Sequence, residues 1–285
     1  MSLVGKSGIL EIGKDVYGIV HEGGATNSGF IVGDEGVIVV EGLETKKLAH
    51  MVQAEVKKVT SKPIRSLICT HFHGDHALGN EYYLPVNVIG HALCRDEMIE
   101  RWDYSVNRFA TRYDENDPAQ AAEHRNARPT PPDVVFHNEN MTLYLGNKRV
   151  ELYYFGKAHT SGDIVVYLPD DKAMYSGDVV TEGSGAPYSE DGFPASWVNV
   201  IENIDKLDID TIVPGHGTIG DKSMAQIELQ FLTGLRDETR KRYDSKVEVN
   251  QAMSDISVPG FESWSDGDMF NIAVSRLYKE FSGEI

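Results

Sequence analysis

The sequence is poor in cysteine and has no long apolar run. Its 285 residues include only two cysteines, Cys69 and Cys94, and this excludes a scaffold held together by disulfides. We expect Cys69 to be a small buried hydrophobe in a strand and Cys94 to lie on a helix. No apolar stretch approaches the roughly 20 residues that span a bilayer, so we expect no membrane insertion.

Positive charge is also scarce. The chain has 27 Lys and Arg against 44 Asp and Glu, and its formal net charge is −17. Nucleic-acid binding draws on clustered Lys and Arg, and no such cluster occurs here, so a nucleic-acid partner is disfavoured. We expect a small-molecule substrate instead, and the oligomeric state stays unknown.

The first residues contain no apolar segment of signal-peptide length. Read literally, this N-terminus predicts a cytoplasmic protein. A chain from which a signal peptide had been removed would begin in the same way, so a periplasmic or secreted location stays open.

What the sequence does have is a dense group of metal-binding side chains in the segment Thr-His-Phe-His-Gly-Asp-His. It places His71, His73, Asp75 and His76 directly after the apolar run 64–69, which predicts a buried strand. In an extended loop the first two histidines point to the same side, and the glycine lets the next two residues face a second point. Imidazole and carboxylate groups bind zinc and related metals. A lone histidine is more often structural, but four such side chains in six residues predict a metal site.

Three later positions extend this interpretation. His159, Asp178 and His216 each follow a short apolar run and lie in a glycine-containing turn. Each is a weak signal alone, since Gly-Asp pairs are common in turns. Their order after the first group makes a shared metal site the better interpretation.

The expected elements alternate between β-rich and αβ segments. Strands and hairpin turns are expected over 8–41, a helix over 44–60, and strands at 64–69, 86–90, 133–136, 141–145, 148–155, 163–168, 172–176 and 210–213. A helix is expected over 195–207, and two helices should close the chain. This order indicates two similar halves in one domain, 1–285, with a helical insertion at 91–128 and a C-terminal helical extension at 221–285. Parallel pairing of the strands stays open.

These motifs resemble those of the metallo-β-lactamase superfamily over roughly residues 15–220. The resemblance implies an α/β fold, a four-layer αβ/βα sandwich with metals at one edge of the sheets. It also implies two ligand sets around a shared carboxylate. His71, His73 and His159 would hold one metal, Asp75, His76 and His216 would hold the other, and Asp178 would bridge them. The implied cofactor is zinc, two ions per chain, with iron or manganese as alternatives.

The resemblance further implies a hydrolase. Two metals roughly 3.5–4 Å apart share a water and lower its pKa to about 7. The bridging hydroxide would cleave a small ester, thioester, lactone or amide. Asp178 as the bridge and Asp75 as a proton acceptor are the expected catalytic residues. Many metallo-β-lactamases have Cys where this chain has Asp178, and commonly lack a ligand at His76, so the set is more similar to glyoxalase II and lactonase-type members. Glu41, where many relatives have Asp, would support the ligands or simply form a turn.

Three other functions stay open. The first is β-lactam hydrolysis. The second is a mononuclear iron dioxygenase of the persulfide type, which would use only part of the ligand set. The third is a non-catalytic metal-binding regulatory protein, which loss of ligands would indicate; none of the seven is lost.

Aromatic residues in two segments are the candidates for substrate binding. Trp102 and Tyr104 lie in the segment 91–128, which either folds over the metals or packs as ordinary core. Tyr188 lies in the loop 181–196, a second candidate wall. A third is the loop 23–27.

Overall fold

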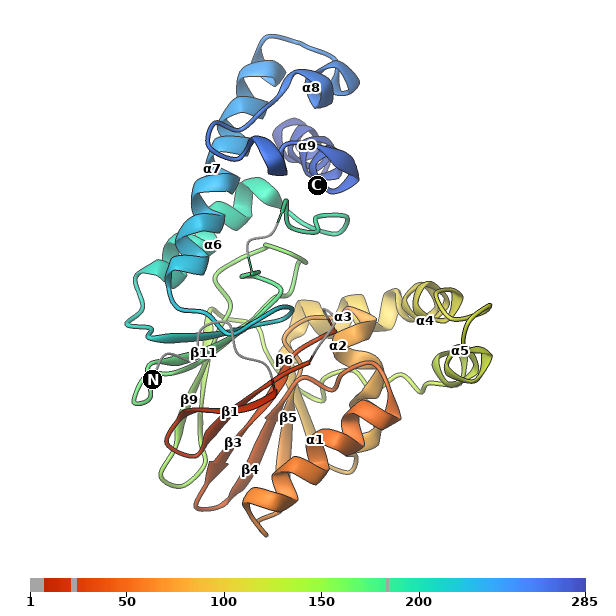
Figure 1. Cartoon of the computed structure of the whole chain (residues 1–285), viewed down its shortest axis with the longest axis vertical. Helices are drawn as coiled ribbons and strands as arrows, with labels where there is room; N and C mark the ends of the chain where they lie inside the picture. The colour runs from red at the N-terminus through yellow and green to blue at the C-terminus, as the bar shows by residue number, and fades with distance from the viewer. Residues whose placement is uncertain (1–7, 22–24, 183–184) are drawn as a thin grey trace.

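Two β-sheets face each other in the computed structural model, which describes residues 8–21, 25–182 and 185–285, and helices cover the outer sides (Figure 1). The strands of the first sheet lie in chain order and are β1 (Gly8–Gly13), β2 (Val16–Val20), β3 (Ser28–Gly33), β4 (Gly36–Val40), β5 (Ile64–Ile68), β6 (Asn87–His91) and β7 (Val134–Phe136). The second sheet has the order β12-β11-β10-β9-β8. Its strands are β8 (Asn140–Tyr144), β9 (Arg149–Tyr153), β10 (Val165–Leu168), β11 (Ala173–Gly177) and β12 (Thr211–Pro214).

Pairing changes from antiparallel to parallel within each sheet. Strands β1 to β4 pair as antiparallel neighbours, whereas β4 to β7 pair in parallel. In the second sheet β8 to β11 are antiparallel, and β11 and β12 are parallel. Parallel neighbours need a crossover connection, which α1 (Lys46–Val59) supplies between β4 and β5 and α6 (Pro194–Asp205) between β11 and β12. The structure thus decides the pairing that the sequence leaves open.

The core consists of three apolar layers between four layers of secondary structure. Side chains of both sheets, such as Ile31 and Val166, meet in the central layer. Val52 of α1 packs in a second layer on the outer face of the first sheet. Trp197 of α6 and Phe231 belong to a third layer on the outer face of the second sheet. Strand β4 is buried throughout because both of its faces are covered. The predicted four-layer sandwich is confirmed.

Helices connect the two halves, as the composition of 91–128 indicates. They are α3 (Ala92–Glu100), α4 (Trp102–Thr111) and α5 (Pro118–Arg125). The start of α5 follows from its sequence, because the side chain of Asp117 accepts a hydrogen bond from the Gln120 amide and Pro118 stands in the first turn. In Figure 1 α4 and α5 project to one side of the first sheet.

Two expectations about helices are wrong. The chain ends in three α-helices rather than two: α7 (Ser223–Asp244), α8 (Val249–Asp255) and α9 (Gly267–Ser282), with a 3₁₀ turn, η3 (Glu262–Trp264), before the last. The short α8 buries only Ala252, so it carries no apolar period that the sequence could reveal. The ligand loop also turns helical at its glycine, as α2 (Gly74–Ala77), and continues as the 3₁₀ helix η2 (Leu78–Tyr83).

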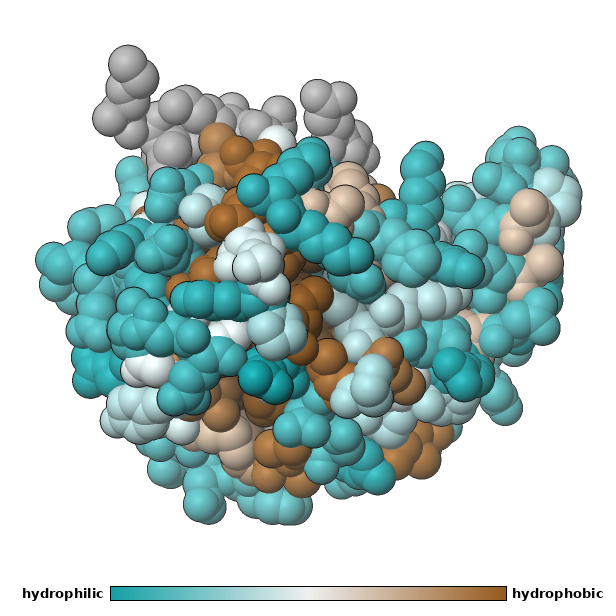
Figure 2. All heavy atoms as spheres, turned by 90° about the horizontal axis from the view of Figure 1, so that it is seen from below, coloured by the Kyte–Doolittle hydropathy of each residue, from teal (hydrophilic) through white to brown (hydrophobic). Residues whose placement is uncertain are grey.

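The face seen from below in Figure 2 is mostly polar, with an interrupted band of apolar side chains. An open groove of about 850 Å³ lies between the β3–β4 turn, the start of β5 and the end of β8, and its lining includes Asp34, Lys62 and Tyr144. None of the predicted ligand residues lines this groove. No helix among the described residues has the length and apolar character needed to cross a bilayer.

Candidate metal centre

Strand ends bring the seven predicted ligand residues together. The ligand motif follows β5, so His71 stands three residues beyond that strand. His73 is the N-cap of α2, and α2 carries Asp75 and His76. Asp178 directly follows β11 and His216 follows β12. Because β11 and β12 are parallel, their carboxyl ends meet at the same edge, and the Gly215 amide donates a hydrogen bond to the Gly177 carbonyl there. His159 enters from the connection between β9 and β10.

Four of these side chains form a first group. One ligand atom from each of His71, His73, His159 and Asp178 lies within 4.8 Å of the others. Nε2 of His159 is 2.8 Å from Nδ1 of His73 and 3.3 Å from Oδ2 of Asp178. Three ring nitrogens and one carboxylate oxygen match the four-coordinate donor set of zinc. Among the described residues, Nε2 of His71 has no hydrogen-bond partner, as expected for a ligand atom turned toward a cation site.

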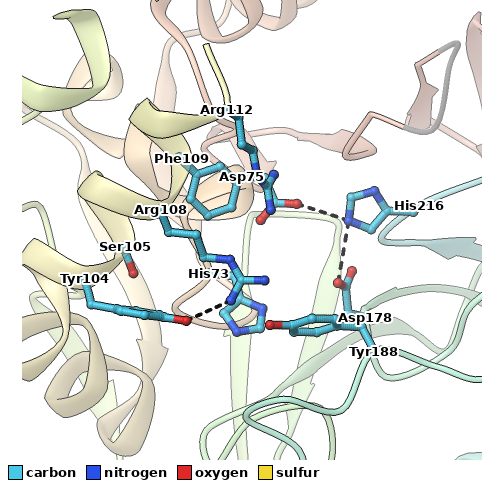
Figure 3. A pocket seen from close by; sticks show the side chains of 10 residues that line it. All are labelled: His73, Asp75, Tyr104, Ser105, Arg108, Phe109, Arg112, Asp178, Tyr188 and His216. Carbon is cyan, nitrogen blue, oxygen red and sulfur yellow. Dashed lines mark hydrogen bonds and ion pairs between the residues drawn. The ribbon is translucent and has the colours of Figure 1, made fainter. Parts of the chain in front are cut away.

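Asp75, His76 and His216 form a second group with the same spread. Nε2 of His76 is 3.4 Å from Nε2 of His216, which is 3.2 Å from Oδ2 of Asp75 (Figure 3). Asp178 contacts both groups, because its Oδ1 lies 3.2 Å from Nε2 of His76 while its Oδ2 faces His159.

Electrostatics prepare these groups for a cation. Burial lowers the pKa of His71 and His73, which favours their neutral, ligating form. Burial alone would raise the pKa of Asp178, but neighbouring histidines hold this pKa well below its ordinary value. Burial opposes protonation of His216, but Asp178 and Asp75 raise its pKa to about 10. Two ionised carboxylates thus face protonated imidazole in the protein alone, and a divalent cation would take over that positive charge.

Glu41 contacts a ligand from behind. It is buried at the end of β4, and its Oε1 lies 3.1 Å from Nδ1 of His76. The hydroxyl of Thr70 donates to the same carboxylate, at 2.5 Å. Glu41 therefore orients a ligand, and a turn role alone does not describe it. Glu41 can also be grouped with His71 and His76 within 4.8 Å, but it faces the His76 nitrogen opposite the one that approaches His216.

Asp191 and Arg101 were not expected from the sequence. Nε2 of His73 lies 2.9 Å from Oδ2 of Asp191, and Arg101 binds the other carboxylate oxygen at 2.6 Å. Asp191 stands in a Ser-Glu-Asp-Gly turn, whose composition is that of any exposed loop. No local pattern could have identified it, because its partner is 118 positions away.

A cavity of about 160 Å³ opens onto this centre (Figure 3). Four ligand residues line it together with one face of α4 and Tyr188. The lining residues are His73, Asp75, Tyr104, Ser105, Arg108, Phe109, Arg112, Asp178, Tyr188 and His216. Tyr104 and Tyr188 therefore lie where the sequence suggested, whereas the structure does not bring Trp102 to the cavity. Trp102 is half-buried and packs against the apolar core.

The loops 23–27 and 181–196 also hold residues of the centre in place. Residues 23–24 of the loop 23–27 and residues 183–184 of the loop 181–196 lie outside the described residues. Of the remainder, the Thr26 hydroxyl donates to Oδ2 of Asp75 at 3.0 Å. The carbonyl of Tyr188 lies 3.0 Å from Nδ1 of His159, so this loop holds a ligand as well as lining the cavity.

A sequence profile of the metallo-beta-lactamase superfamily matches residues 21–216, more than half of the chain, and includes all seven predicted ligand residues. The chain belongs to the metallo-beta-lactamase superfamily. This family consists of metal-dependent hydrolases, and membership supports a hydrolase activity for the chain. The family resemblance predicted from the motifs is confirmed.

Curated relatives within the superfamily include metallo-beta-lactamases of type 2. The relative from Bacillus cereus is 25% identical over 202 residues, covering 70% of this chain and 69% of the relative. The relative from Elizabethkingia meningoseptica is 22% identical over 220 residues, covering 76% and 78%. The greater similarity to glyoxalase II and lactonase-type members stays a prediction.

Solved structures of the same fold cover different parts of the chain. A metallo-beta-lactamase from Pontibacter korlensis matches 80% of this chain and 99% of its own, with a TM-score of 0.60 and 22% identity. A sec-alkylsulfatase from Pseudomonas sp. matches 98% of this chain with a TM-score of 0.77 and 14% identity. This chain spans about half (51%) of that sulfatase. At these identities the likeness shows the fold alone.

Proposed function

We propose that this protein is a zinc-dependent hydrolase with two metal ions per chain that cleaves a small ester, thioester, lactone or amide. One observation carries the proposal: the two oxygens of Asp178 face two separate ligand groups, at 3.2 Å from His76 and 3.3 Å from His159. A carboxylate has two oxygens and can join two cations, which an imidazole cannot do in that way.

Bound zinc would lower the pKa of a water and polarise the carbonyl group of a substrate. The chain itself supplies the rest. His71 and His73 are kept neutral by burial and can ligate without losing a proton. Asp75 lines the cavity with one carboxylate oxygen held by Thr26, and is placed to accept a proton during turnover. The rings of Tyr104, Phe109 and Tyr188 would contact the substrate and limit its size.

A second candidate is β-lactam hydrolysis, which the names of the curated relatives favour. A mononuclear iron dioxygenase would need only part of the ligand set, and a regulatory protein would need no cavity at the centre. The seven ligand residues and the adjoining cavity favour the dinuclear hydrolase over both.

The test is a screen of lactones, thioesters and β-lactams with zinc-loaded protein, together with elemental analysis. We expect close to two metal equivalents and hydrolysis of at least one class. Asp178→Ala should lose metal and reduce hydrolysis by more than ~100-fold, because loss of a ligand should exceed the ~10–100-fold cost of losing an outer partner. Asp170→Ala, an exposed site paired with Arg149, is the matched control and should behave as the parent protein.

One metal equivalent, or near-normal activity in Asp178→Ala, would contradict the dinuclear proposal. Oxygen uptake with iron-loaded protein would identify the dioxygenase instead. Hydrolysis confined to β-lactams would select the second candidate.

A further inference from the structure

One face of α4 forms a wall of the cavity at the metal centre. The lining residues of this wall, spaced four apart along two rows, are Tyr104, Arg108 and Arg112 in one row and Ser105 and Phe109 in the other. Figure 3 shows the side chains of Arg108, Phe109 and Arg112 extending from the helix toward the ligand residues, whereas the short side chain of Ser105 stays beside it. The wall therefore presents two guanidinium groups to a cavity in a protein whose net charge is −17.

The charge of Arg108 is already balanced. Its guanidinium binds Oε2 of Glu190 at 3.0 Å and the Tyr104 hydroxyl at 3.1 Å. It also lies 5.0 Å from the centre of the Tyr188 ring. Arg108 thus links α4 to the loop that carries Tyr188, and its Nη1 is engaged with the protein.

Arg112 differs in its partners. Its guanidinium lies 4.2 Å from the centre of the Phe109 ring, a stacking contact that restrains the side chain. Among the described residues no carboxylate lies within 4.0 Å of it, and its side chain makes no hydrogen bond. Glu44 interacts electrostatically with Arg112 from a greater distance. Burial and the negative charge of Asp75 raise the pKa of Glu44 to about 7. Arg112 is therefore an exposed cation beside the centre, without a close acidic partner in the part of the chain that the structure describes.

We propose that Arg112 binds a carboxylate of the substrate, separate from the bond that is cleaved. The inference rests on the proposed hydrolase function and specifies its substrate class: a small carboxylic acid that also carries an ester, thioester, lactone or amide. A planar guanidinium pairs with a carboxylate through two parallel hydrogen bonds. The rings of Phe109, Tyr104 and Tyr188 would contact the apolar part between the two ends.

The charges around the cavity select a singly charged group. Asp75 and Asp178 line the same cavity, and Glu190 binds the lining residue Arg108. One unpaired guanidinium can neutralise one negative charge, whereas a phosphate monoester carries close to two at neutral pH. Bound metals would neutralise Asp75 and Asp178, so the preference for a single negative charge rests on the single guanidinium of Arg112.

Two chromogenic esters of equal length test the proposal on zinc-loaded protein. The monoester 4-nitrophenyl hydrogen glutarate has a free carboxylate at the end where 4-nitrophenyl pentanoate has a methyl group. We expect a higher kcat/KM for the glutarate monoester. Arg112→Gln should lower its kcat/KM by about 10–100-fold, the cost of one charge-assisted contact, and change that of the pentanoate less than about twofold. Arg112→Lys should restore part of the loss.

Arg236→Ala is the matched control, because it also removes one positive charge but lies on α7, paired with Asp237. It should leave the ratio between the two esters unchanged. Melting temperature should be the same in all variants, since Arg112 is exposed. Equal kcat/KM values for the two esters in the parent protein, or equal losses for both in Arg112→Gln, would overturn the proposal and leave the hydrolase function intact.

Binding to metal-free protein separates this inference from the hydrolase proposal. Without metal the esters are not expected to turn over, so their dissociation constants can be measured by saturation-transfer NMR. We expect the glutarate monoester to bind more tightly than the pentanoate, and Arg112→Gln to remove the difference. If neither ester is hydrolysed but this difference is present, the hydrolase proposal is weakened and the role of Arg112 stands. Equal binding of the two esters, or a stronger competition by 4-nitrophenyl phosphate, would contradict a carboxylate site.

Discussion

Three imidazoles of the centre have a polar partner on the outer nitrogen, and this partner sets which nitrogen faces inward. Asp191 binds Nε2 of His73, so Nδ1 of that ring faces His159. The Tyr188 carbonyl contacts Nδ1 of His159, so Nε2 of His159 faces inward. Glu41 contacts Nδ1 of His76, and Nε2 of the same ring therefore faces Asp178. Because the polar partner of its second nitrogen orients a ligating histidine, these contacts hold the rings in position for a metal.

Asp191→Ala should weaken zinc binding by ~10–100-fold, because His73 would lose the partner that sets its ring orientation. Asp191→Asn keeps an acceptor oxygen of similar position and should lose less. Affinity can be measured by competition with a chromophoric chelator. Asp237→Ala, an exposed acid on α7, is the control. Unchanged affinity in Asp191→Ala would show that the ring of His73 is held by packing alone.

At the scale of elements, α4 has two different sides. Trp102 packs toward the core, whereas Tyr104, 43% exposed, lines the cavity. In the sequence both are aromatic residues two positions apart. They differ because residues two apart on a helix point to different sides of it. The segment 91–128 is therefore both core and cavity wall, and the two alternatives seen in its sequence apply to different residues.

Trp102→Ala and Tyr104→Ala should consequently change different properties of the protein, its stability and its substrate preference respectively. We expect Trp102→Ala to lower the free energy of unfolding by about 2–4 kcal/mol and to affect all substrates alike, because it removes half-buried apolar area. Tyr104→Ala should change kcat/KM between substrates while the melting temperature stays nearly constant. Denaturant unfolding and a panel of esters measure both. Equal loss across substrates in Tyr104→Ala, with a lowered melting temperature, would remove its role as a wall.

Another element contact joins α7 to the turn that follows β11. Glu228 of α7 is fully buried, and its Oε2 accepts hydrogen bonds from the Thr181 amide at 2.8 Å and the Thr181 hydroxyl at 3.2 Å. Burial raises the pKa of Glu228 from 4.5 to about 8. The folded protein therefore holds this proton more tightly than the unfolded chain does.

The stability that comes from this proton is fully present below about pH 4.5 and is lost as the pH rises toward 8. Glu228→Gln keeps an acceptor oxygen but does not ionise. We expect it to match the parent protein near pH 5 and to exceed its unfolding free energy by on the order of 3 kcal/mol at pH 8. Urea unfolding at the two pH values measures this. An identical pH profile in both proteins would show that Glu228 reaches solvent.

At the scale of the whole molecule, the centre joins the two halves of the chain. The motif at 71–76 belongs to the half with the first sheet, whereas His159, Asp178 and His216 come from the half with the second. A cation bound by both sets of ligands would connect the halves. A ligand that binds only the folded state raises the stability of that state. The gain grows with the logarithm of the ratio of free ligand concentration to Kd.

Removal of metal should therefore lower the melting temperature of the whole protein. At a free zinc concentration 100 times Kd the stabilisation is about 2.7 kcal/mol, which corresponds to roughly 5–10 °C for a chain of this size. Calorimetry before and after chelation, and after zinc is returned, measures the shift. Asp178→Ala should show a smaller one. A melting temperature that does not respond to chelation would mean that the centre contributes nothing to holding the halves together.

The four-layer sandwich was implied by the family that the motifs resemble. The sequence alone determined the order of most elements and marked seven residues as proposed metal ligands. These are recorded in local patterns: a period of two or 3.6 residues, and short motifs placed directly after strands. Errors arose where a pattern was too short, as in α8, or where a loop became helical after Gly74.

Only the tertiary structure decided which residues support the centre and which line its cavity. Asp191, Glu228 and Arg112 look like ordinary surface residues in the sequence, because their roles depend on neighbours from distant segments or, for Arg112, on the absence of an acidic one among the described residues. A single sequence records neighbours along the chain, whereas burial, charge pairing and the direction of a helix face arise from packing. A cluster of metal-binding side chains could be predicted for this reason, whereas the distant residues that hold these side chains in place could not.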